Sequence, residues 1–406
     1  MKNILFVTFM ILAGCHEREE TLMGRVEEIP LETRESGNAF LSQSDLGHVY
    51  LSWLEYENES KVSLRLAQLN GSHTGWEDLG TVNSGNDWFV NWADFPSVVP
   101  IDRGRFIAHW LQYSGEGTYD YDIRYSISNN NGKSWSAPLY LNDTTINAEY
   151  GFATIKKTGN KAFAVWLDGR HMAGGHSENH QHQGSGDMNL RSAYINRDGF
   201  KEDEVVLDDQ TCDCCNTEVI ITNSGPLVAY RNKSDGGVRD IHIMQQRGGE
   251  WLKDSPLHRD NWYINGCPVN GPAGDGEGDE LAIAWFSGAA DSAAVNLKLS
   301  HDGGKNFGPI IKVSNQKVLG RVDVIMHKTK GSVYVSWMES KNKDARLKIA
   351  EYNLLGEQKT EFEVASMSGA RKSGFPRMVR LKNELFVVYT DVSDLGSQRI
   401  RTLKIN

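Results

Sequence analysis

The chain carries arginines and carboxylates that could act on an acidic sugar. Guanidinium groups bind carboxylates and sulfates through paired hydrogen bonds. Two carboxyl groups can cleave a glycosidic bond, one protonating the leaving oxygen while the other attacks or stabilises the sugar cation. The candidates for sugar binding are Arg170, Arg231, Arg239, Asn270, Arg321 and Arg377. The candidates for catalysis are Asp94, Asp168, Glu218, Tyr230 and Asp323.

Four cysteines form a second group with its own chemistry. Cys212, Cys214 and Cys215 lie together, and Cys267 lies in a later loop. An even number of cysteines in an exported chain favours disulfides, and closing a loop of roughly 50 residues contributes about 4 kcal/mol in the chain-entropy model. Because two adjacent cysteines bond to each other only with strain, we expect Cys267 to bond to Cys214 or Cys215. The alternative is a thiolate site for Zn or Cu.

A histidine-rich loop lies between Trp166 and the clustered cysteines. It contains His171, His176, His180 and His182 among glycines. Imidazole groups bind transition metals, so His171 and His176 are candidate metal ligands beside the cysteines. The alternative is a surface loop without a bound ion. Sugar hydrolysis itself would need no cofactor.

A repeated pattern of strands must position these groups. A β-rich run ending in an aromatic residue, followed by polar residues and a second β run, occurs seven times at intervals of 52 to 64 residues. The aromatic residues are Trp53, Trp110, Trp166, Tyr230, Trp285, Trp337 and Tyr389. Each unit has room for four strands between Gly- and Asn-rich turns, and no segment has a sustained helical period. The sequence therefore predicts an all-β fold, a propeller of seven four-stranded blades.

The two ends of the repeat complement each other. The seventh unit ends at Asn406 after its third strand, while residues 25–33, before the first unit, have strand character. We predict that this N-terminal strand closes the last blade. The expected organisation is a signal peptide at 1–14, a lipidated tether at 15–37 that includes the closing strand, and one propeller domain at 38–406.

The propeller indicates where most of the candidate residues lie. The first strand of each blade lines the central channel, so polar residues at the starts of these strands should share one rim. The residues at these starts are Asp94, Glu218, Asn270, Arg321, Asp323 and Arg377, and loops after second strands add Asp168, Arg170, Arg231 and Arg239. One interpretation is an anionic-glycan site on this rim. The other is a set of buried salt bridges between blades.

Two turns carry a more specific signature. Residues 128–135 (SNNNGKSW) and 300–307 (SHDGGKNF) both fit Ser-x-Asp/Asn-x-Gly-x-x-aromatic between a third and a fourth strand. This pattern resembles the Asp-box (BNR repeat) of sialidase-like propellers, and the chain is similar to bacterial propeller lipoproteins of that type. The resemblance implies a glycoside hydrolase of exo-sialidase type. The boxes themselves are structural, because Asp or Asn caps the turn and Gly supplies a positive φ.

The N-terminus and the net charge set the expected location. Ile4 to Ala13 is an apolar run, and Leu-Ala-Gly-Cys follows up to Cys15. This pattern predicts a lipoprotein signal with Cys15 acylated, in the bacterial cell envelope with the outer membrane favoured. The net charge of −10 is unfavourable for binding nucleic acid. We expect a monomer whose partner is a glycan or glycoconjugate and whose contact with the membrane is the lipid anchor.

Three functions from different classes remain open on the sequence alone. The first is a surface glycosidase with an arginine-rich site. The second is a propeller that binds a glycan or a protein without cleaving it. The third is a metal-binding or redox lipoprotein that uses the cysteine and histidine loops. No nucleotide-binding loop, nucleophile elbow, zinc-protease motif or EF-hand is present.

Overall fold

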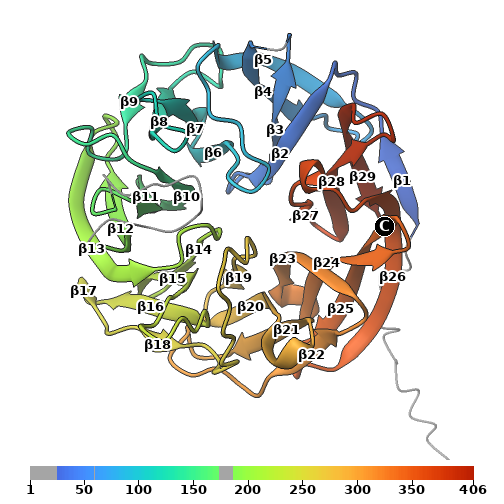
Figure 1. Ribbon diagram of the computed structural model, residues 1–406. Coiled ribbons are helices and arrows are strands. Elements are labelled where there is room, and N and C mark those ends of the chain that lie inside the picture. The colour runs from blue at the N-terminus through green and yellow to red at the C-terminus, as the bar shows by residue number, and fades with distance from the viewer. Residues whose placement is uncertain (1–24, 59, 173–185) are drawn as a thin grey trace, which may run out of the picture.

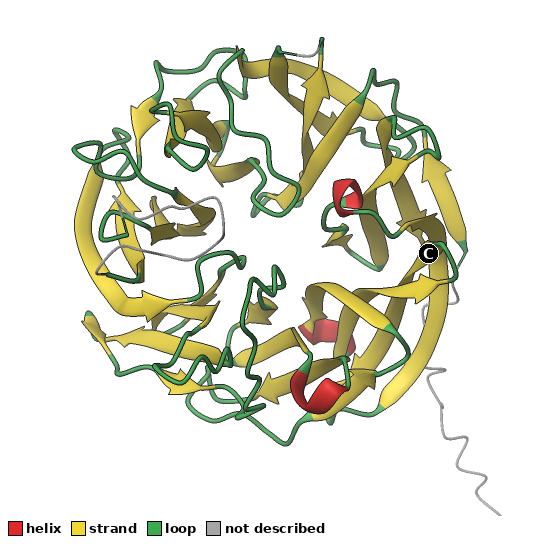
Figure 2. Ribbon diagram, viewed as in Figure 1, coloured by secondary structure: helices red, strands yellow, loops and turns green. Residues whose placement is uncertain are grey.

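The computed structural model describes residues 25–58, 60–172 and 186–406. Its described residues form seven antiparallel sheets arranged radially around a central channel (Figure 1). This confirms the predicted all-β propeller of seven blades. Helix in these residues is limited to three single-turn 3-10 segments, η1 (Ala289–Asp291), η2 (Lys328–Lys330) and η3 (Arg371–Ser373), shown in red in Figure 2. None of the described helices is long and apolar enough to cross a bilayer.

The first three blades each have four strands, which follow one another from the channel outward. Blade 1 consists of β2 (Ser36–Gln43), β3 (Val49–Tyr56), β4 (Val62–Leu69) and β5 (Trp76–Gly85). Blade 2 consists of β6 (Ser97–Asp102), β7 (Arg105–Tyr113), β8 (Tyr121–Ser128) and β9 (Leu139–Tyr140). Blade 3 consists of β10 (Tyr150–Thr158), β11 (Lys161–Asp168), β12 (Met188–Ile195) and β13 (Lys201–Thr211).

The next three blades repeat this order, with an extra short strand in blade 4. Blade 4 consists of β14 (Glu218–Thr222), β15 (Gly225–Arg231), β16 (Ile241–Arg247), β17 (Glu250–Trp251) and β18 (Ser255–Pro256). Blade 5 consists of β19 (Ala273–Glu277), β20 (Glu280–Ser287), β21 (Ala294–Ser300) and β22 (Ile311–Ser314). Blade 6 consists of β23 (Val318–His327), β24 (Ser332–Lys341), β25 (Asp344–Asn353) and β26 (Gln358–Ser368).

Blade 7 is built from both ends of the chain, as predicted. Its order from the channel is β27 (Arg377–Leu381), β28 (Glu384–Val392), β29 (Gln398–Ile405) and β1 (Val26–Ile29). The N-terminal strand β1 pairs antiparallel with β29, with Val26 opposite Ile405. The ring is thereby closed by backbone hydrogen bonds, so that β29 is not left as an unpaired edge.

The recurring aromatic residue of the second strand fills the space between blades. Trp110, Trp166, Trp285 and Trp337 are each at most 1% exposed. Trp166 of blade 3 belongs to the same core cluster as Ile107 and Ile123 of blade 2. Because burial of a large side chain contributes about 1.5–3 kcal/mol, the repeated aromatic position is a main source of cohesion between blades.

The inner strands all begin on one face of the ring, which we call the upper face. The two Asp-box-like turns join third to fourth strands and therefore lie on the opposite, lower face. Asn130 Oδ1 accepts a hydrogen bond from the Ser134 N–H at 2.9 Å, and Asp302 Oδ1 accepts one from the Asn306 N–H at 2.9 Å. These equivalent bonds fix both turns and leave the upper face to the loops that could bind a ligand.

Candidate functional site

The central channel contains a cavity of about 390 Å³ lined by the inner strands. Four of the candidate residues contribute to its wall: Asp94, Glu218, Asp323 and Arg377. Asp94, Glu218 and Arg377 lie at or just before the start of an inner strand, whereas Asp323 lies within β23, after a register shift that begins at Gly320. The structure also places Lys156 of β10 and Asp275 of β19 on this wall.

Channel carboxylates join neighbouring blades through the backbone. Asp94 accepts a hydrogen bond from the Phe152 N–H at 2.7 Å, and Asp323 accepts one from the Met378 N–H at 2.6 Å. Asp275 repeats the pattern with the Met326 N–H at 2.8 Å. In each case the acceptor belongs to the blade before that of the donor, so these carboxylates hydrogen-bond neighbouring blades to each other around the channel. The residues therefore fit the salt-bridge and hydrogen-bond interpretation better than a pair of catalytic acids.

Burial changes the acidity of these groups. It raises the pKa of Asp94 to about 7, because only the Phe152 N–H stabilises the carboxylate. Burial likewise raises the pKa of Asp323, although the Arg377 guanidinium lies 3.2 Å away. A third channel acid, Asp275, has a pKa of about 6 for the same reason. Asp94 is thus partly protonated near neutral pH.

A lysine balances part of the negative charge in the channel. Lys156 Nζ lies 3.2 Å from Glu218 Oε1. Burial works against the charge on Lys156, but Glu218 and Asp275 outweigh this effect and raise the lysine pKa. The channel is therefore lined by paired charges rather than by a free anion-binding surface.

Two candidate catalytic residues lie away from the channel cavity. Asp168 is completely buried, and its two oxygens accept hydrogen bonds from Arg170 Nε and Nη2, each at 2.7 Å. Tyr230 donates its hydroxyl to Asp208 of blade 3 at 2.5 Å, and only 1% of the residue is exposed. The structure gives all three residues internal partners: Asp168 and Arg170 pair within blade 3, and Tyr230 joins blade 4 to blade 3.

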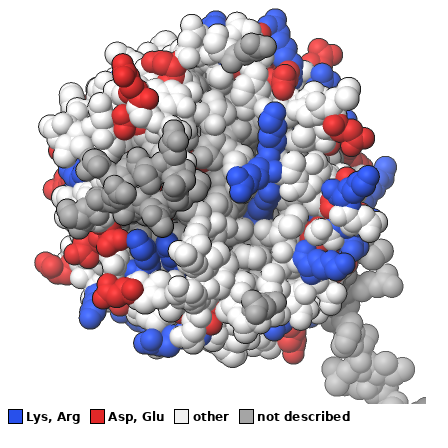
Figure 3. Space-filling view, in the orientation of Figure 1, with Lys and Arg blue, Asp and Glu red and all other residues white. Residues whose placement is uncertain are grey.

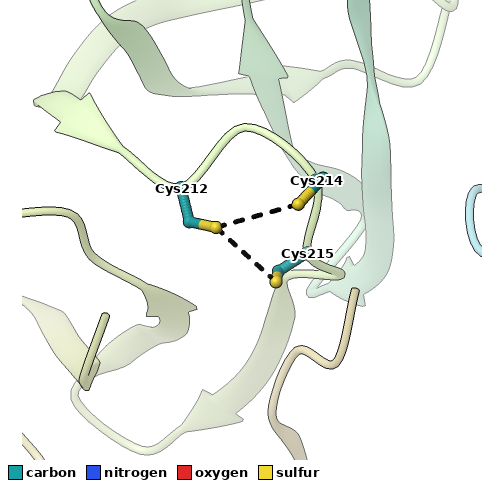
Figure 4. A group of neighbouring side chains, drawn as sticks. All are labelled: Cys212, Cys214 and Cys215. Atoms are coloured by element: carbon teal, nitrogen blue, oxygen red, sulfur yellow. Dashed lines mark hydrogen bonds between the residues drawn. The ribbon is translucent and has the colours of Figure 1, made fainter. Parts of the chain in front are cut away.

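The cysteines form a cluster on the upper face, between β13 and β14. The sulfurs of Cys212 and Cys215 are 3.7 Å apart, and those of Cys212 and Cys214 are 4.0 Å apart (Figure 4). A disulfide requires about 2.05 Å, so the expected bridges are not formed and all four cysteines are free thiols. The expectation that the two cysteine loops meet is correct, because the thiol of Cys267 lies within 4.8 Å of that of Cys214.

Three candidate sugar-binding residues surround this cluster instead of a sugar site. Arg231 is buried and donates to the carbonyl oxygens of Asn270 (2.7 Å), Arg239 (2.6 Å) and Phe286 (2.8 Å). Arg239 Nη1 lies 3.3 Å from Asp213. The bonds to Asn270 and Phe286 connect β15 to blade 5. Burial opposes ionisation of Cys215, but its hydrogen bonds to the neighbouring thiols and the charge of Arg231 outweigh burial and lower its pKa well below the usual value.

The structure does not bring the predicted histidine ligands to the cysteine cluster among the residues that it describes. His171 is exposed after β11, and none of the metal-ligating groups found among the described residues includes it. His176 lies outside the described residues, as does the lipidation site Cys15.

The upper face has a second hollow, which the sequence pattern did not predict. This groove, which we call the mouth groove, has a volume of about 720 Å³. It is formed by upper-face loops of blades 7, 1 and 2, and its lining residues are Glu35, Asn38, Tyr56, Glu57, Asn58, Val90, Asn91, Trp92, Arg371, Lys372 and Gln398. Asn38 could have pointed to this groove from the sequence, because it is a polar residue near the start of the first strand of blade 1, as several channel residues are in their blades.

One wall of the mouth groove is cationic. Arg371 and Lys372 are exposed on η3, and neither forms a salt bridge with any described carboxylate. Figure 3 shows Lys and Arg side chains gathered near the centre of this face, at the position that η3 has in Figure 2. Unpaired cations in a concave surface attract anionic ligands.

Arg321, a candidate from the sequence, supports this wall from below. Its Nη1 donates to the carbonyl oxygens of Ala370 (3.1 Å) and Gly374 (3.2 Å), which flank η3. Its guanidinium also lies 4.9 Å from the ring centre of Trp92. Burial, together with repulsion from Arg371, lowers the pKa of Arg321 to about 10, so the group stays charged at neutral pH.

The rest of the groove combines an aromatic ring with hydrogen-bonding groups. Trp92 is half-buried and stacks on Phe375 with ring centres 5.8 Å apart. Asn38 accepts the Tyr56 hydroxyl at 3.2 Å and donates to the Asn91 carbonyl at 2.6 Å. Burial raises the pKa of Tyr56 to about 12. The groove thus offers an indole side chain, amides and two cations in one place.

Comparisons with known proteins identify the architecture. No family model and no curated protein sequence matches the chain. A protein of unknown function from Dyadobacter fermentans has a similar structure, with a TM-score of 0.51 at 13% identity over 94% of this chain and 99% of that one. The polysaccharide lyase Uly1 gives 0.52 at 10% identity over 93% and 91% of the two chains. An endosialidase of phage phi92 gives 0.51 at 10% identity over 94% and 69%. At these identities the likeness shows the propeller fold that the chain shares with them.

Proposed function

We propose that this chain is a cell-envelope propeller that binds acidic oligosaccharides in the mouth groove. The observation that carries the proposal is the pair Arg371 and Lys372, exposed and without a carboxylate partner among the described residues, beside the half-buried ring of Trp92. Two of the structures that share the fold are named as an endosialidase and a polysaccharide lyase. Since 10% identity speaks for fold alone, the proposal rests on the groove.

Each part of the groove has a counterpart in an acidic sugar. Arg371 and Lys372 bind the carboxylate or sulfate, with the guanidinium supplying paired hydrogen bonds. The Trp92 indole packs against the apolar face of a sugar ring. The Gln398 amide can donate to and accept from sugar hydroxyls, whereas the Asn58 amide can donate, since its oxygen already accepts from Ser60 and Lys61.

Titration calorimetry with sialylated, uronate-containing and sulfated oligosaccharides tests the proposal. We expect Arg371→Ala/Lys372→Ala to weaken binding at least about tenfold, since each charge-assisted hydrogen bond contributes roughly 1.5–3 kcal/mol. The matched control is Lys133→Ala/Lys305→Ala, which also removes two positive charges, but from exposed positions in the lower-face turns. Equal affinities for the two double variants would contradict the proposal.

A second candidate function is hydrolysis of the bound glycan. The observation that favours it is that the groove also contains Glu35 and Tyr56, and that Glu35 acts electrostatically on the Tyr56 hydroxyl. A Tyr–Glu pair in a groove that also contains Arg371 resembles the nucleophile arrangement of sialidases. Turnover of a fluorogenic sialoside or glycoside by the wild type, lost in Tyr56→Phe and Glu35→Gln with binding retained, would establish it. Binding without turnover of any substrate in the panel would contradict hydrolysis and support only the binding function.

We further propose that the chain is lipidated at Cys15 and held at the outer membrane. The support is the Leu-Ala-Gly-Cys pattern after the apolar run in the sequence. An envelope location suits a protein that captures glycans, because the groove would then face the compartment that polysaccharide fragments enter.

A further inference from the structure

The four cysteines outside the signal segment meet in the structure although they come from two loops. Cys212, Cys214 and Cys215 lie between β13 and β14, and their sulfurs are all within 4.8 Å of one another. Cys267 comes from the loop between β18 and β19 and approaches Cys214. Figure 4 shows the thiols of the first three turned toward one another rather than toward separate packing sites. The glycan proposal does not use this cluster, although Cys214 also packs against a core cluster of blades 3 and 4.

We infer that Cys212, Cys214, Cys215 and Cys267 form a thiolate centre for one thiophilic d¹⁰ metal ion, Zn(II) or Cu(I). The spacing of the sulfurs supports this. A tetrahedral Zn site has Zn–S bonds of about 2.3 Å, which puts its sulfurs about 3.8 Å apart. The Cys212 sulfur lies 3.7 Å from that of Cys215 and 4.0 Å from that of Cys214. Thiolate ligands select these soft ions over Mg²⁺ or Ca²⁺.

The surroundings suit a centre with excess negative charge. Cys212 and Cys215 are buried, at 1% and 2% exposure, so water does not stabilise their thiolates. The guanidinium groups of Arg231 and Arg239 act electrostatically on Cys215 and Cys212 respectively. The backbone N–H of Asn270 hydrogen-bonds to Cys215, a contact that commonly orients metal ligands. Two arginines can offset the two negative charges of a Zn(II) tetrathiolate.

Binding is a proton-for-metal exchange with no change of oxidation state. Each ligating thiol loses its proton to solvent and its sulfur lone pair forms the bond to the metal ion. The ion would join the loop before blade 4 to the loop before blade 5. Its removal should therefore loosen the upper rim next to Arg231 and Asn270, which hydrogen-bond across the same blades.

Cys267 distinguishes the two ions. A structural Zn(II) site is closed by four protein ligands, and in an all-thiolate site Cys267 supplies the fourth in addition to the three clustered thiols. Cu(I) forms trigonal sites with three thiolates, so Cys212, Cys214 and Cys215 suffice. Cys267→Ser should abolish stable Zn(II) binding and leave Cu(I) binding within about threefold.

The test uses the purified chain with Cys15→Ser, so that only the four rim thiols remain. After reduction and chelation under nitrogen, Zn²⁺ and Cu⁺ are titrated separately, and bound metal is measured by elemental analysis and X-ray absorption. We expect one ion per chain with a sulfur shell at about 2.3 Å. Cys214→Ser should weaken binding at least about 100-fold, while the control Asp209→Asn, at an exposed position three residues before Cys212, should not.

Two results would overturn the inference. One is wild-type binding no tighter than that of Cys214→Ser. The other is a coordination shell of nitrogen and oxygen without sulfur. If Cys214→Ser does not fold, alkylation of the wild-type protein decides: bound metal should protect Cys214, the clustered thiol that is not fully buried, and equal labelling of Cys214 with and without metal would contradict the site.

Discussion

The guanidinium of Arg321 lies 4.9 Å from the ring of Trp92, which joins blade 6 to the loop between blades 1 and 2. The same guanidinium holds the two carbonyl oxygens that flank η3. A residue in the first strand of blade 6 therefore fixes both the aromatic surface and the cationic wall of the mouth groove. The groove is consequently organised before a ligand arrives, which reduces the entropy lost on binding.

Replacing Trp92 tests the aromatic surface of the groove. We expect Trp92→Ala to weaken binding of an acidic oligosaccharide about tenfold, because the ring face is lost and Arg321 loses its stacking partner. Trp92→Phe keeps a ring and should lose less affinity. Calorimetry at two salt concentrations measures both effects, and the ring contribution should not depend on salt. Unchanged affinity in a folded Trp92→Ala protein would show that the sugar lies elsewhere.

Asp94 should make stability depend on pH. Its pKa is raised from 3.8 to about 7 in the folded state, so the native protein retains a proton that the unfolded chain releases. This contribution is complete below pH 3.8 and is lost as the pH rises through about 7. Asp94→Asn keeps an oxygen for the Phe152 N–H and removes the titration. Relative to wild type, the variant should gain about 3 kcal/mol between about pH 4.5 and 8, at roughly 1.4 kcal/mol per pH unit.

Urea denaturation of both proteins at the two pH values measures this difference. Asp94 acts electrostatically on Tyr121, which stays neutral across the range because burial raises its pKa well above 10. A difference in unfolding free energy that is the same at both pH values would contradict the assignment.

The fold could be predicted because each blade is built from consecutive residues, and because the extra N-terminal strand matches the strand that the last blade lacks. Trp166 and its equivalents mark the second strand of each blade, and the strand surplus at Val26–Ile29 matches the deficit after Ile405. Channel residues such as Asp323 could be predicted for the same reason, since the inner strand of each blade is visible in the sequence. Their partners could not, because the Met378 N–H that donates to Asp323 belongs to the next blade.

The mouth groove could not be predicted from the repeat. Arg371 and Lys372 lie on a 3-10 turn before β27, outside the four-strand pattern, and two adjacent basic residues are common on surfaces. The role of these two cations in the groove depends on Trp92 and Asn38, which are about 280 and 330 residues away in sequence. They come near only because the closed ring places blade 7 beside blade 1. The disulfide expectation failed for a similar reason: the sequence contains the number of cysteines but not the distances between their sulfurs.

The closing strand makes a prediction about stability. Ile29 is 3% exposed and packs in the core shared by blades 7 and 1. Ile29→Ala should lower the free energy of unfolding by about 2–4 kcal/mol through lost contacts and a cavity. The control Glu28→Ala removes an exposed salt bridge to Arg401 (2.7 Å) and should cost less than about 1 kcal/mol. Equal urea midpoints for the two variants would argue against β1 as a structural strand.

Lipidation at Cys15 can be tested in cells. We expect the wild-type chain to incorporate labelled palmitate and to sediment with membranes, because acyl chains supply the anchoring energy. Cys15→Ala should incorporate no label and remain in the soluble fraction. Sedimentation of that variant with membranes would point to another means of attachment.

A crystal structure with the acidic oligosaccharide that binds most tightly would test the central claim most directly. The account predicts a sugar ring against Trp92, with its carboxylate or sulfate bonded to Arg371 or Lys372 in the mouth groove. Sugar bound in the central channel, or on the lower face, at a concentration that saturates binding in solution would contradict it.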